Sequence, residues 1–517
     1  MLAQLQLMTV VWTVLASLVI YAVYQFYIKP YMSLLYYKKQ GGASKFHWKL
    51  ISYFDDYQNA YTRGDFFYTF KNLMKKNPKA KFIVDNFASR VHVIPIDPEM
   101  IKEVLRRYDV YHKDEKLFKG MADTVKGSMV FAEGSDWKKK RKIVSSSFNF
   151  ESLKHVVPMI MSTAQDHFKD WIAKGKLEDM NLVEHMGMIT GDVTGKFFFG
   201  KNFGDKKING VALTTCMQAY LVQAMNDLIS ATGLLFGPNF SKMNLLPSHR
   251  KMNKTSEDLR SVFKEMIKEA EENPKKEDNL LSIYLNHIQN LKKEDRKEEE
   301  QLTHNEIVGE FLGIFAAGTD TTSHLLASTI YFLSKHPEVF AKVKEEADRE
   351  FADLGKVDIN SINRMDYTTA VLKEGLRLGG PVAGLFDRTA VKDDDLCGVK
   401  VRKGDMIIVW QDLAFTDEKF FSQPREFIPE RWLNNSGFDQ EGFKNEPYSY
   451  IPFSAGPRNC VGQHLAMIEA RIVLALFVRT FSFQFSPYFK FTLVQKFTYE
   501  TDEPMLVTLS PLKENSH

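Results

Sequence analysis

The sequence contains little cysteine. Three thiols, Cys216, Cys397 and Cys460, are spread over 517 residues, which is too few for a disulfide framework. This usage is typical of a protein body that folds in a reducing compartment. The net charge is only +3 at pH 7, so the chain lacks the strongly basic balance of a nucleic-acid-binding protein. We therefore expect no disulfide-stapled fold and no nucleic-acid partner.

The start of the chain lacks charge. No charged residue occurs before Lys29, and nearly every side chain from Leu7 to Ile28 is apolar or aromatic. At about 1.5 Å per residue, a helix over this run spans about 33 Å, enough for the core of a bilayer. A cleaved signal peptide is the alternative, but it should have a basic start and a shorter apolar stretch. We predict an uncleaved transmembrane anchor at residues 1–28.

Basic residues follow this apolar run but do not precede it. Lys29, Lys38 and Lys39 come directly after it, and the positive-inside rule then leaves the rest of the chain in the cytosol. We divide that remainder into a linker, residues 29–45, and one large domain, residues 46–517.

Helical periodicity dominates the long middle of the chain, so the expected fold class is mainly α with minor β-sheets. The segments Phe82–Val84 and Val91–Ile94 predict strands, and Asp97 before a proline predicts the start of a helix. Residues 399–410 predict a hairpin that turns at Lys403–Gly404.

One cysteine has a setting that the other two lack. Cys460 follows a Gly-Pro-Arg turn and precedes a long apolar helical run. The N-terminus of a helix favours a thiolate over a thiol. Gly456 and Gly462 allow a bulky group to approach the backbone, and Arg458 supplies a cation. This combination suits a metal cofactor that carries carboxylates, such as a Cys-ligated haem. The alternative is a buried, inert thiol.

The same segment meets every fixed position of a family signature, F-x-x-G-x-R-x-C-x-G, at Phe453, Gly456, Arg458, Cys460 and Gly462. The chain thus resembles the cytochrome P-450 family of haem-thiolate monooxygenases. The resemblance implies haem b (iron protoporphyrin IX) with Cys460 as the axial iron ligand, Phe453 beside the sulfur and Arg458 at a haem propionate. It covers essentially the whole chain and implies the cytochrome P-450 fold, a single haem domain behind an N-terminal transmembrane helix.

A second motif lies inside a predicted long helix. Thr303 and Glu306 form the pattern of a capping box, and helical character continues to Lys335. The stretch Ala317–Thr322 in its middle contains glycine and three threonines, which weaken a helix. It could be only a packing kink, but it matches the family motif [AG]-G-x-[DE]-T-[TS] in full. The resemblance then implies that Asp320 and Thr321 guide protons to the oxygen that the haem activates.

A third motif pairs an acid with an arginine. Glu374 and Arg377 share one helix face, and Arg431 follows in the stretch Pro-Glu-Arg-Trp. Such pairs are common, but the family has both elements in this order. The resemblance implies a buried structural triad of Glu374, Arg377 and Arg431.

Two further cofactor contacts are implied by the family pattern. Trp137 and Arg141 are four residues apart, so they share a helix face. The corresponding W-x-x-x-R motif of the family aims both at a haem propionate. Arg388 matches the other common propionate-binding arginine.

Lysines surround the first of these arginines. Lys138, Lys139, Lys140 and Lys142 predict a basic surface patch, although ordinary solvated lysines are an equal alternative. In the family this surface receives a flavoprotein reductase. We therefore expect an NADPH-dependent flavoprotein reductase as electron donor, with cytochrome b5 as a further partner, at the endoplasmic reticulum membrane.

The sequence leaves the substrate open. The side chains that could line its site are largely apolar, which fits a lipophilic small molecule such as a fatty acid, a sterol or a xenobiotic. They are Leu117, Phe118, Met121, Phe315, Ala316 and Val382–Phe386. Apolar residues between 234 and 246 fit either membrane contact or core packing.

Two other functions remain open on this fold. An isomerase or lyase would rearrange a peroxide without O2 or reductase, and a non-catalytic haem sensor would turn nothing over. The complete Asp320–Thr321 motif argues against both, because it serves the delivery of protons.

Overall fold

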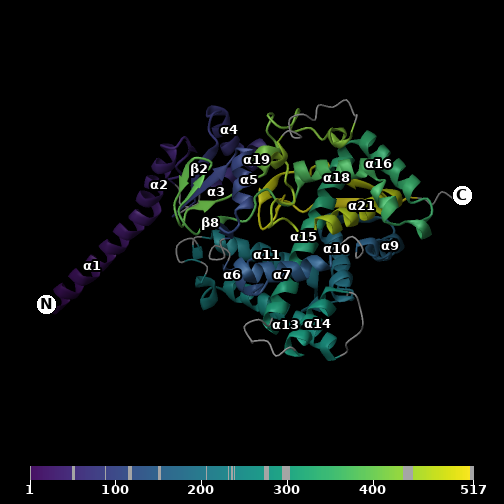
Figure 1. The fold of residues 1–517 in the computed structure, drawn as a ribbon, viewed down its shortest axis with the longest axis horizontal. Helices are drawn as coiled ribbons and strands as arrows, with labels where there is room; N and C mark the ends of the chain where they lie inside the picture. Colours follow the sequence, from purple (N-terminus) through teal and green to yellow (C-terminus); the bar gives the residue numbers. More distant parts are fainter. Residues whose placement is uncertain are drawn as a thin grey trace. The chain divides into compact units, whose positions relative to one another are not determined.

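The computed structural model describes residues 2–48, 53–87, 89–113, 119–148, 153–204, 206–230, 232–233, 237, 239–272, 279–293, 303–434 and 446–512. The chain divides into two compact units. Unit 1 comprises Met1–Asp114, Gly384–Ala414 and Ala455–Arg458, and unit 2 comprises Glu115–Ala383, Phe415–Ser454 and Asn459–His517. Helices predominate and the sheets are small (Figure 1), which confirms the expected fold class.

Unit 1 contains a six-stranded sheet with the strand order β1-β2-β3-β11-β8-β4. Its strands are β1 (Ala43–Ser44), β2 (Phe82–Phe87), β3 (Arg90–Pro95), β4 (Tyr111–Lys113), β8 (Arg388–Ala390) and β11 (Met406–Ile407), and a separate pair is β9 (Asp394–Leu396) with β10 (Val399–Val401). Its helices after the N-terminal segment are α3 (Tyr53–Arg63), α4 (Tyr68–Lys76) and α5 (Pro98–Arg106), and α19 (Asp412–Phe415) ends at its boundary. The predicted strands of β2 and β3 are confirmed, and the Asp97 carboxylate caps α5 by accepting from two backbone N–H groups.

The predicted hairpin around Lys403–Gly404 is wrong. Strand β10 pairs with the preceding strand β9, and β11 pairs with β3 and β8 instead of β10. The hairpin turn is formed by Cys397 and Gly398, with φ values of 51° and 88°. Two positive φ values match the twist that a two-residue hairpin requires. Cysteine rarely occupies such a turn, so the sequence pattern predicted the turn at Gly404 instead of at Gly398.

The N-terminal segment is helical well past the predicted anchor. Helix α1 (Leu2–Val23) continues through a π-helical turn (Tyr24–Ile28) into α2 (Lys29–Lys38). In the described part of the chain, one helix, Gln6–Lys38, is long and apolar enough to cross a membrane, and its most apolar stretch has a mean hydropathy of 2.0. The segment predicted as a linker, 29–45, holds α2 and β1.

Unit 2 holds most of the helices. They are α6 (Lys119–Thr124), α7 (Gly134–Ser146), α9 (Val156–Ala173), α10 (Leu182–Phe199), α11 (Leu213–Ile229), α13 (Pro247–Glu272), α14 (Leu280–Lys293), α15 (His304–Lys335), α16 (Pro337–Glu350), α17 (Ile359–Asn363), α18 (Asp366–Gly379) and α21 (Gln463–Thr480). Its strands are β5 (Leu177–Asn181), β6 (Lys207–Ile208), β7 (Val211–Ala212), β12 (Phe481–Phe485), β13 (Leu493–Gln495), β14 (Tyr499–Thr501) and β15 (Leu506–Pro511). The sheets are β12-β15-β5, β13-β14 and β6-β7.

Helix α15 is the central element of unit 2. It packs against α10, α18, α13 and α21 (Figure 1), and most of its side chains are buried. The predicted capping box is confirmed, because the Thr303 side chain accepts from the Glu306 backbone and the Glu306 side chain accepts from the Thr303 backbone. The helix then runs unbroken through the Ala317–Thr322 motif to Lys335.

Candidate functional site

Cys460 lies in a closed loop just before α21. Its backbone N–H donates to the Phe453 carbonyl at 2.9 Å, and the helix begins after the N-cap residue Gly462. The Cys460 side chain is exposed. Cys460 is therefore not a buried thiol. A Cβ added at Gly462 would lie 4.0 Å from its sulfur.

Arg141 reaches this loop from α7. Its two terminal nitrogens donate to the backbone carbonyl and the side-chain oxygen of Asn459, each at 2.7 Å. Burial lowers the pKa of Arg141, and interaction with Cys460 raises it. Trp137, one turn earlier on the same helix, is buried. The structure thus brings the arginine of the W-x-x-x-R motif beside the cysteine loop.

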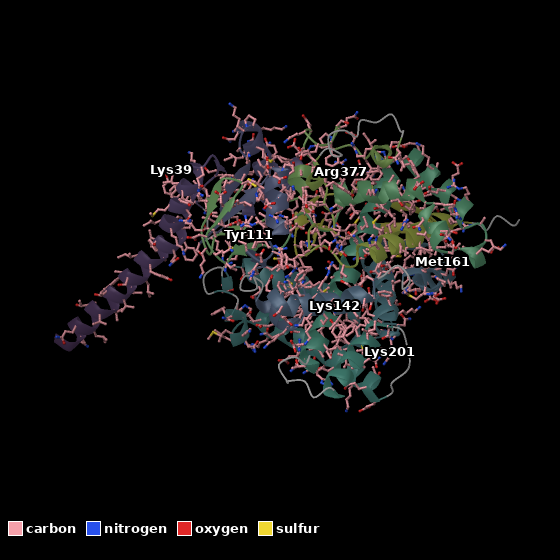
Figure 2. The ribbon with its side chains drawn as sticks, viewed as in Figure 1. Lys39, Tyr111, Lys142, Met161, Lys201 and Arg377 are labelled. Carbon is pink, nitrogen blue, oxygen red and sulfur yellow. The ribbon has the colours of Figure 1, made fainter. Side chains whose placement is uncertain are left out.

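The predicted basic patch loses one member. Lys138 and Lys142 are exposed, and Lys142 is labelled in Figure 2. Lys140 is only 2% exposed and pairs with Asp136 at 2.8 Å and Glu306 at 3.3 Å. The assignment of Lys140 to the surface is therefore wrong. The helical period places it on the inner face of α7, where two carboxylates compensate its charge.

The remaining cofactor candidates belong to unit 1. Gly456 has a φ of 72°, and a Cβ there would lie 2.7 Å from the Leu105 carbonyl oxygen. Only glycine fits such a position without displacing the backbone. Arg458 is buried in the same loop, and Arg388 is buried on β8.

The three charged residues of the third motif meet inside unit 2. Arg377 Nη2 lies 2.7 Å from Glu374 Oε1, and Arg431 Nε lies 2.9 Å from the same oxygen. The Trp432 indole N–H also donates to Glu374, at 2.9 Å. Glu374 is fully buried and Arg377, labelled in Figure 2, is 1% exposed. Removal of one partner would leave an uncompensated charge in the interior.

The motif in α15 combines an exposed face with a buried acid. Ala317 is exposed and Thr321 half-exposed, whereas the residues before and after them on the helix are mostly buried. These two residues are four apart, so they share one face. The Thr321 hydroxyl donates to the Ala317 carbonyl at 2.7 Å. Asp320 points to the other side, where Gln218 Nε2 donates to it at 3.2 Å.

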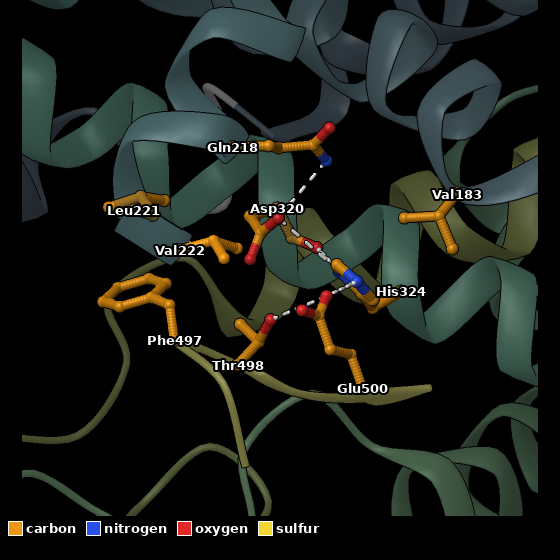
Figure 3. A pocket seen from close by; sticks show the side chains of 9 residues that line it. All are labelled: Val183, Gln218, Leu221, Val222, Asp320, His324, Phe497, Thr498 and Glu500. Atoms are coloured by element: carbon orange, nitrogen blue, oxygen red, sulfur yellow. Dashed lines mark hydrogen bonds and ion pairs between the residues drawn. The ribbon is translucent and has the colours of Figure 1, made fainter. Parts of the chain in front are cut away.

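Two charged residues near Asp320 were not predicted. His324 and Glu500 line a pocket together with Asp320, and dashed lines in Figure 3 mark their contacts. His324 follows Asp320 by four residues, which is a readable signal for one helix face. Glu500 carries no such signal, because it comes from β14, far along the chain.

The predicted substrate-lining residues have mixed outcomes. Leu117 and Phe118 lie outside the described residues, as do positions 234–236 of the apolar 234–246 region. Leu245 is exposed. Phe315 is fully buried and packs against the rings of Phe203 and Phe263, with centroids 5.1 and 5.6 Å away. It is therefore part of an aromatic core and was wrongly assigned to the substrate site.

Comparison with known proteins gives a consistent result. A family model described as cytochrome P-450 matches residues 60–500. A 7-deoxyloganic acid hydroxylase from Catharanthus roseus is 28% identical over 415 residues, which cover 77% of this chain and 76% of the relative. An 11-oxo-beta-amyrin 30-oxidase from Glycyrrhiza uralensis is 30% identical over 410 residues, covering 76% and 74%. The crystal structure of the cytochrome P-450DA haem domain shares the fold, with a TM-score of 0.71, 20% identity and coverage of 86% of this chain and 93% of that one.

Proposed function

Because this chain belongs to the cytochrome P-450 family, we propose that it is a membrane-anchored monooxygenase that inserts one oxygen atom from O2 into a lipophilic substrate. The family binds haem b, and its members are oxidoreductases. The observation that carries the proposal is the exposed thiol of Cys460, in a loop that meets every fixed position of the haem-binding signature.

The residues of unit 2 fit a haem. The Cys460 side chain is exposed, as a side chain that ligates a bound metal must be in the bare protein. Helix α15 is buried along most of its length but opens at Ala317 and Thr321, which leaves one face for a flat group. A haem also carries two propionates, and Arg141 is a half-buried cation beside the cysteine loop.

Each candidate residue has a defined task in this proposal. Cys460 would ligate the iron, and Arg141, Arg388 and Arg458 would hold the propionates. When bound, the haem supplies the iron centre at which O2 is activated. The Thr321 hydroxyl donates a hydrogen bond to the Ala317 carbonyl in this structure, so it would have to turn from that carbonyl to donate to a group on the exposed face.

Asp320 is the acid of the proposed proton pathway. It is 5% exposed, and burial raises the pKa of its carboxyl. A raised pKa makes the carboxyl easier to protonate, which suits a group that takes up a proton and passes it on.

Features of the surface and of the N-terminus support the proposed partners and location. Two relatives are named for the hydroxylation of 7-deoxyloganic acid and the oxidation of 11-oxo-beta-amyrin, which supports a small organic molecule as the substrate. The exposed lysines of α7 would contribute to docking a separate NADPH-dependent reductase. The apolar helix, followed by Lys29, Lys38 and Lys39, supports a single-pass anchor in the endoplasmic reticulum membrane, with the haem domain in the cytosol.

The first experiment is the difference spectrum of the dithionite-reduced, CO-bound protein. We expect the red-shifted Soret band of a thiolate-ligated haem in the wild type and its loss in Cys460→Ala, because alanine offers the iron no ligand. Cys397→Ala is the matched control, since Cys397 is also exposed but lies in a hairpin turn. That variant should keep the band.

Other spectra would contradict the proposal. A thiolate band that survives in Cys460→Ala would refute the assignment of the iron ligand, and a folded wild type without haem would refute the cofactor. Turnover that proceeds without NADPH would instead support the isomerase or lyase.

A further inference from the structure

His324 joins two acids in the interior of unit 2. Its Nε2 lies 2.5 Å from Glu500 Oε2 on β14. Its Nδ1 lies 2.8 Å from the Asp320 carbonyl and 3.6 Å from Asp320 Oδ1. The imidazole therefore bridges from a strand to the acid of the α15 motif, as Figure 3 shows.

A small pocket adjoins this bridge. It has a volume of about 90 Å³, enough to hold several water molecules. Its lining combines a polar side with an apolar one: Gln218, Asp320, His324, Thr498 and Glu500, against Val183, Leu221, Val222 and Phe497. Polar groups of both acids and of the imidazole thus line a space in which water can bridge them.

The cluster is charged at neutral pH. The two carboxylates raise the pKa of His324 to about 9, against the opposing effect of burial. Lys496 Nζ lies 3.5 Å from Glu500 Oε1. This ammonium and the imidazolium of His324 lower the pKa of Glu500, although burial alone would raise it. A buried ion pair is weak evidence for a stabilising role, because an apolar replacement is often as stable. A charged histidine at this position therefore points to a use for its proton.

We propose that His324 supplies protons to Asp320 and is itself recharged through Glu500 and water in the pocket. The inference rests on the proposed function and extends its proton pathway to the solvent side. His324 and Glu500 act through Asp320, so they are positioning residues and not members of the reacting site.

The proton balance is simple. The imidazolium gives the proton on Nδ1 to the Asp320 carboxylate after a rotation of the Asp320 side chain. This leaves a neutral imidazole and a neutral carboxyl. Asp320 passes its proton on towards Thr321. The imidazole ring then turns over, so that its bare Nδ1 faces Glu500 and takes up one proton from solvent by way of pocket water and the Glu500 carboxylate. No electrons move in these steps, and one solvent proton enters for each proton delivered.

The test compares full-length wild type with His324→Gln and Glu500→Gln. A positioned general acid raises a reaction rate by on the order of 10²-fold, and water can replace part of a proton relay. We therefore expect product per NADPH to fall by about tenfold in His324→Gln, with the lost electrons recovered as peroxide, and by less in Glu500→Gln. Glu500→Asp should recover part of the loss.

Coupling in the wild type should decline as the pH rises through about 9, where His324 loses its proton, and His324→Gln should lack this decline.

A second readout does not depend on turnover. Infrared titration follows the C=O stretch of the protonated Asp320 carboxyl, which is identified by its absence in Asp320→Asn. The His324 cation lowers the pKa of Asp320, so in His324→Gln the carboxyl should keep its proton to higher pH.

The control is another buried histidine with a carboxylate partner. His249 Nε2 lies 2.9 Å from Asp227 Oδ1 and its side chain is 2% exposed, but neither residue lines the pocket. His249→Gln should lower thermal stability and keep wild-type coupling.

Wild-type coupling in both His324→Gln and Glu500→Gln, or an unshifted Asp320 titration, overturns the relay. If His324→Gln fails to fold, Glu500→Gln decides. A wild type without the thiolate band in its CO spectrum would refute the proposed function instead.

Discussion

Glu310 is an ionisable side chain enclosed in unit 2. It is 1% exposed on α15, and its Oε2 accepts from the Met129 backbone N–H at 2.6 Å. Neither Glu310 Oε1 nor the nearby Tyr284 hydroxyl has a hydrogen-bond partner among the described residues. Burial raises the pKa of Glu310 to about 8. The residue is therefore neutral in the folded state near neutral pH and ionises when the chain unfolds.

This difference predicts a pH-dependent stability. A carboxyl whose pKa is raised by folding stabilises the fold below its unfolded value, about 4.5, and that stability is lost as the pH rises through about 8. Glu310→Gln keeps an oxygen for the Met129 N–H and has no proton to lose. The stability of this variant relative to the wild type should therefore rise between about pH 5 and pH 8, by on the order of 4 kcal/mol. The melting temperatures of the two proteins, measured over this pH range, check it.

The matched control for Glu310 is Glu345→Gln, because Glu345 is an exposed glutamate on α16. Its melting temperature should follow that of the wild type at every pH. Parallel curves for Glu310→Gln and wild type would show that Glu310 is ionised in the folded protein.

At the scale of elements, α15 depends on glycines where other backbone approaches it. A Cβ added at Gly309 would lie 1.9 Å from the Lys126 carbonyl oxygen, and one at Gly127 would lie 2.3 Å from the Glu306 Cα. The loop before α7 therefore packs directly on the helix backbone. Such contacts leave no flexible side chain that could move aside.

Gly309→Ala should accordingly destabilise the protein, by about 3 kcal/mol, since overpacking costs exceed the gain in helix propensity. Thermal melting is the measurement. Gly187→Ala on α10 is the matched helical control, because the nearest atom to its Cβ would be the flexible Gln218 amide at 3.2 Å. That variant should stay close to wild type. A Gly309→Ala melting temperature equal to that of Gly187→Ala would contradict the close packing.

At the scale of the whole molecule, the anchor and the folded body meet at α2. The described apolar helix extends to Lys38, but Tyr37 at its end is fully buried and α2 packs on β2 and β3. Any membrane-crossing part of this helix would therefore end before α2, near Ile28, because α2 belongs to the fold of unit 1.

Removal of residues 2–28 should release the protein from membranes and leave its melting temperature unchanged, because α2 is kept. Fractionation after an alkaline wash measures the first result. A second cut that also removes α2 should lower the melting temperature. Mass analysis of the intact protein checks processing, since a cleaved signal peptide would remove this segment from the mature chain.

The sequence by itself determined the features whose signals are local. The apolar N-terminal helix, the capping box at Thr303, the strands β2 and β3 and the cysteine loop each depend on residues close together in the chain. A cap, a turn or an amphipathic face is set by neighbours within a few positions, so it can be read without knowing the fold. The family signature is local in the same sense.

Tertiary structure decided the contacts between distant segments. The burial of Lys140 depends on Glu306, the pairing of β11 depends on β3 and β8, and the place of Glu500 depends on a strand that returns to α15. Nothing in the residues around any of these positions encodes its partner, because such contacts form only when separate elements pack. Local chemistry therefore identified the candidate haem ligand, and packing alone brought Glu500 to His324, beside Asp320.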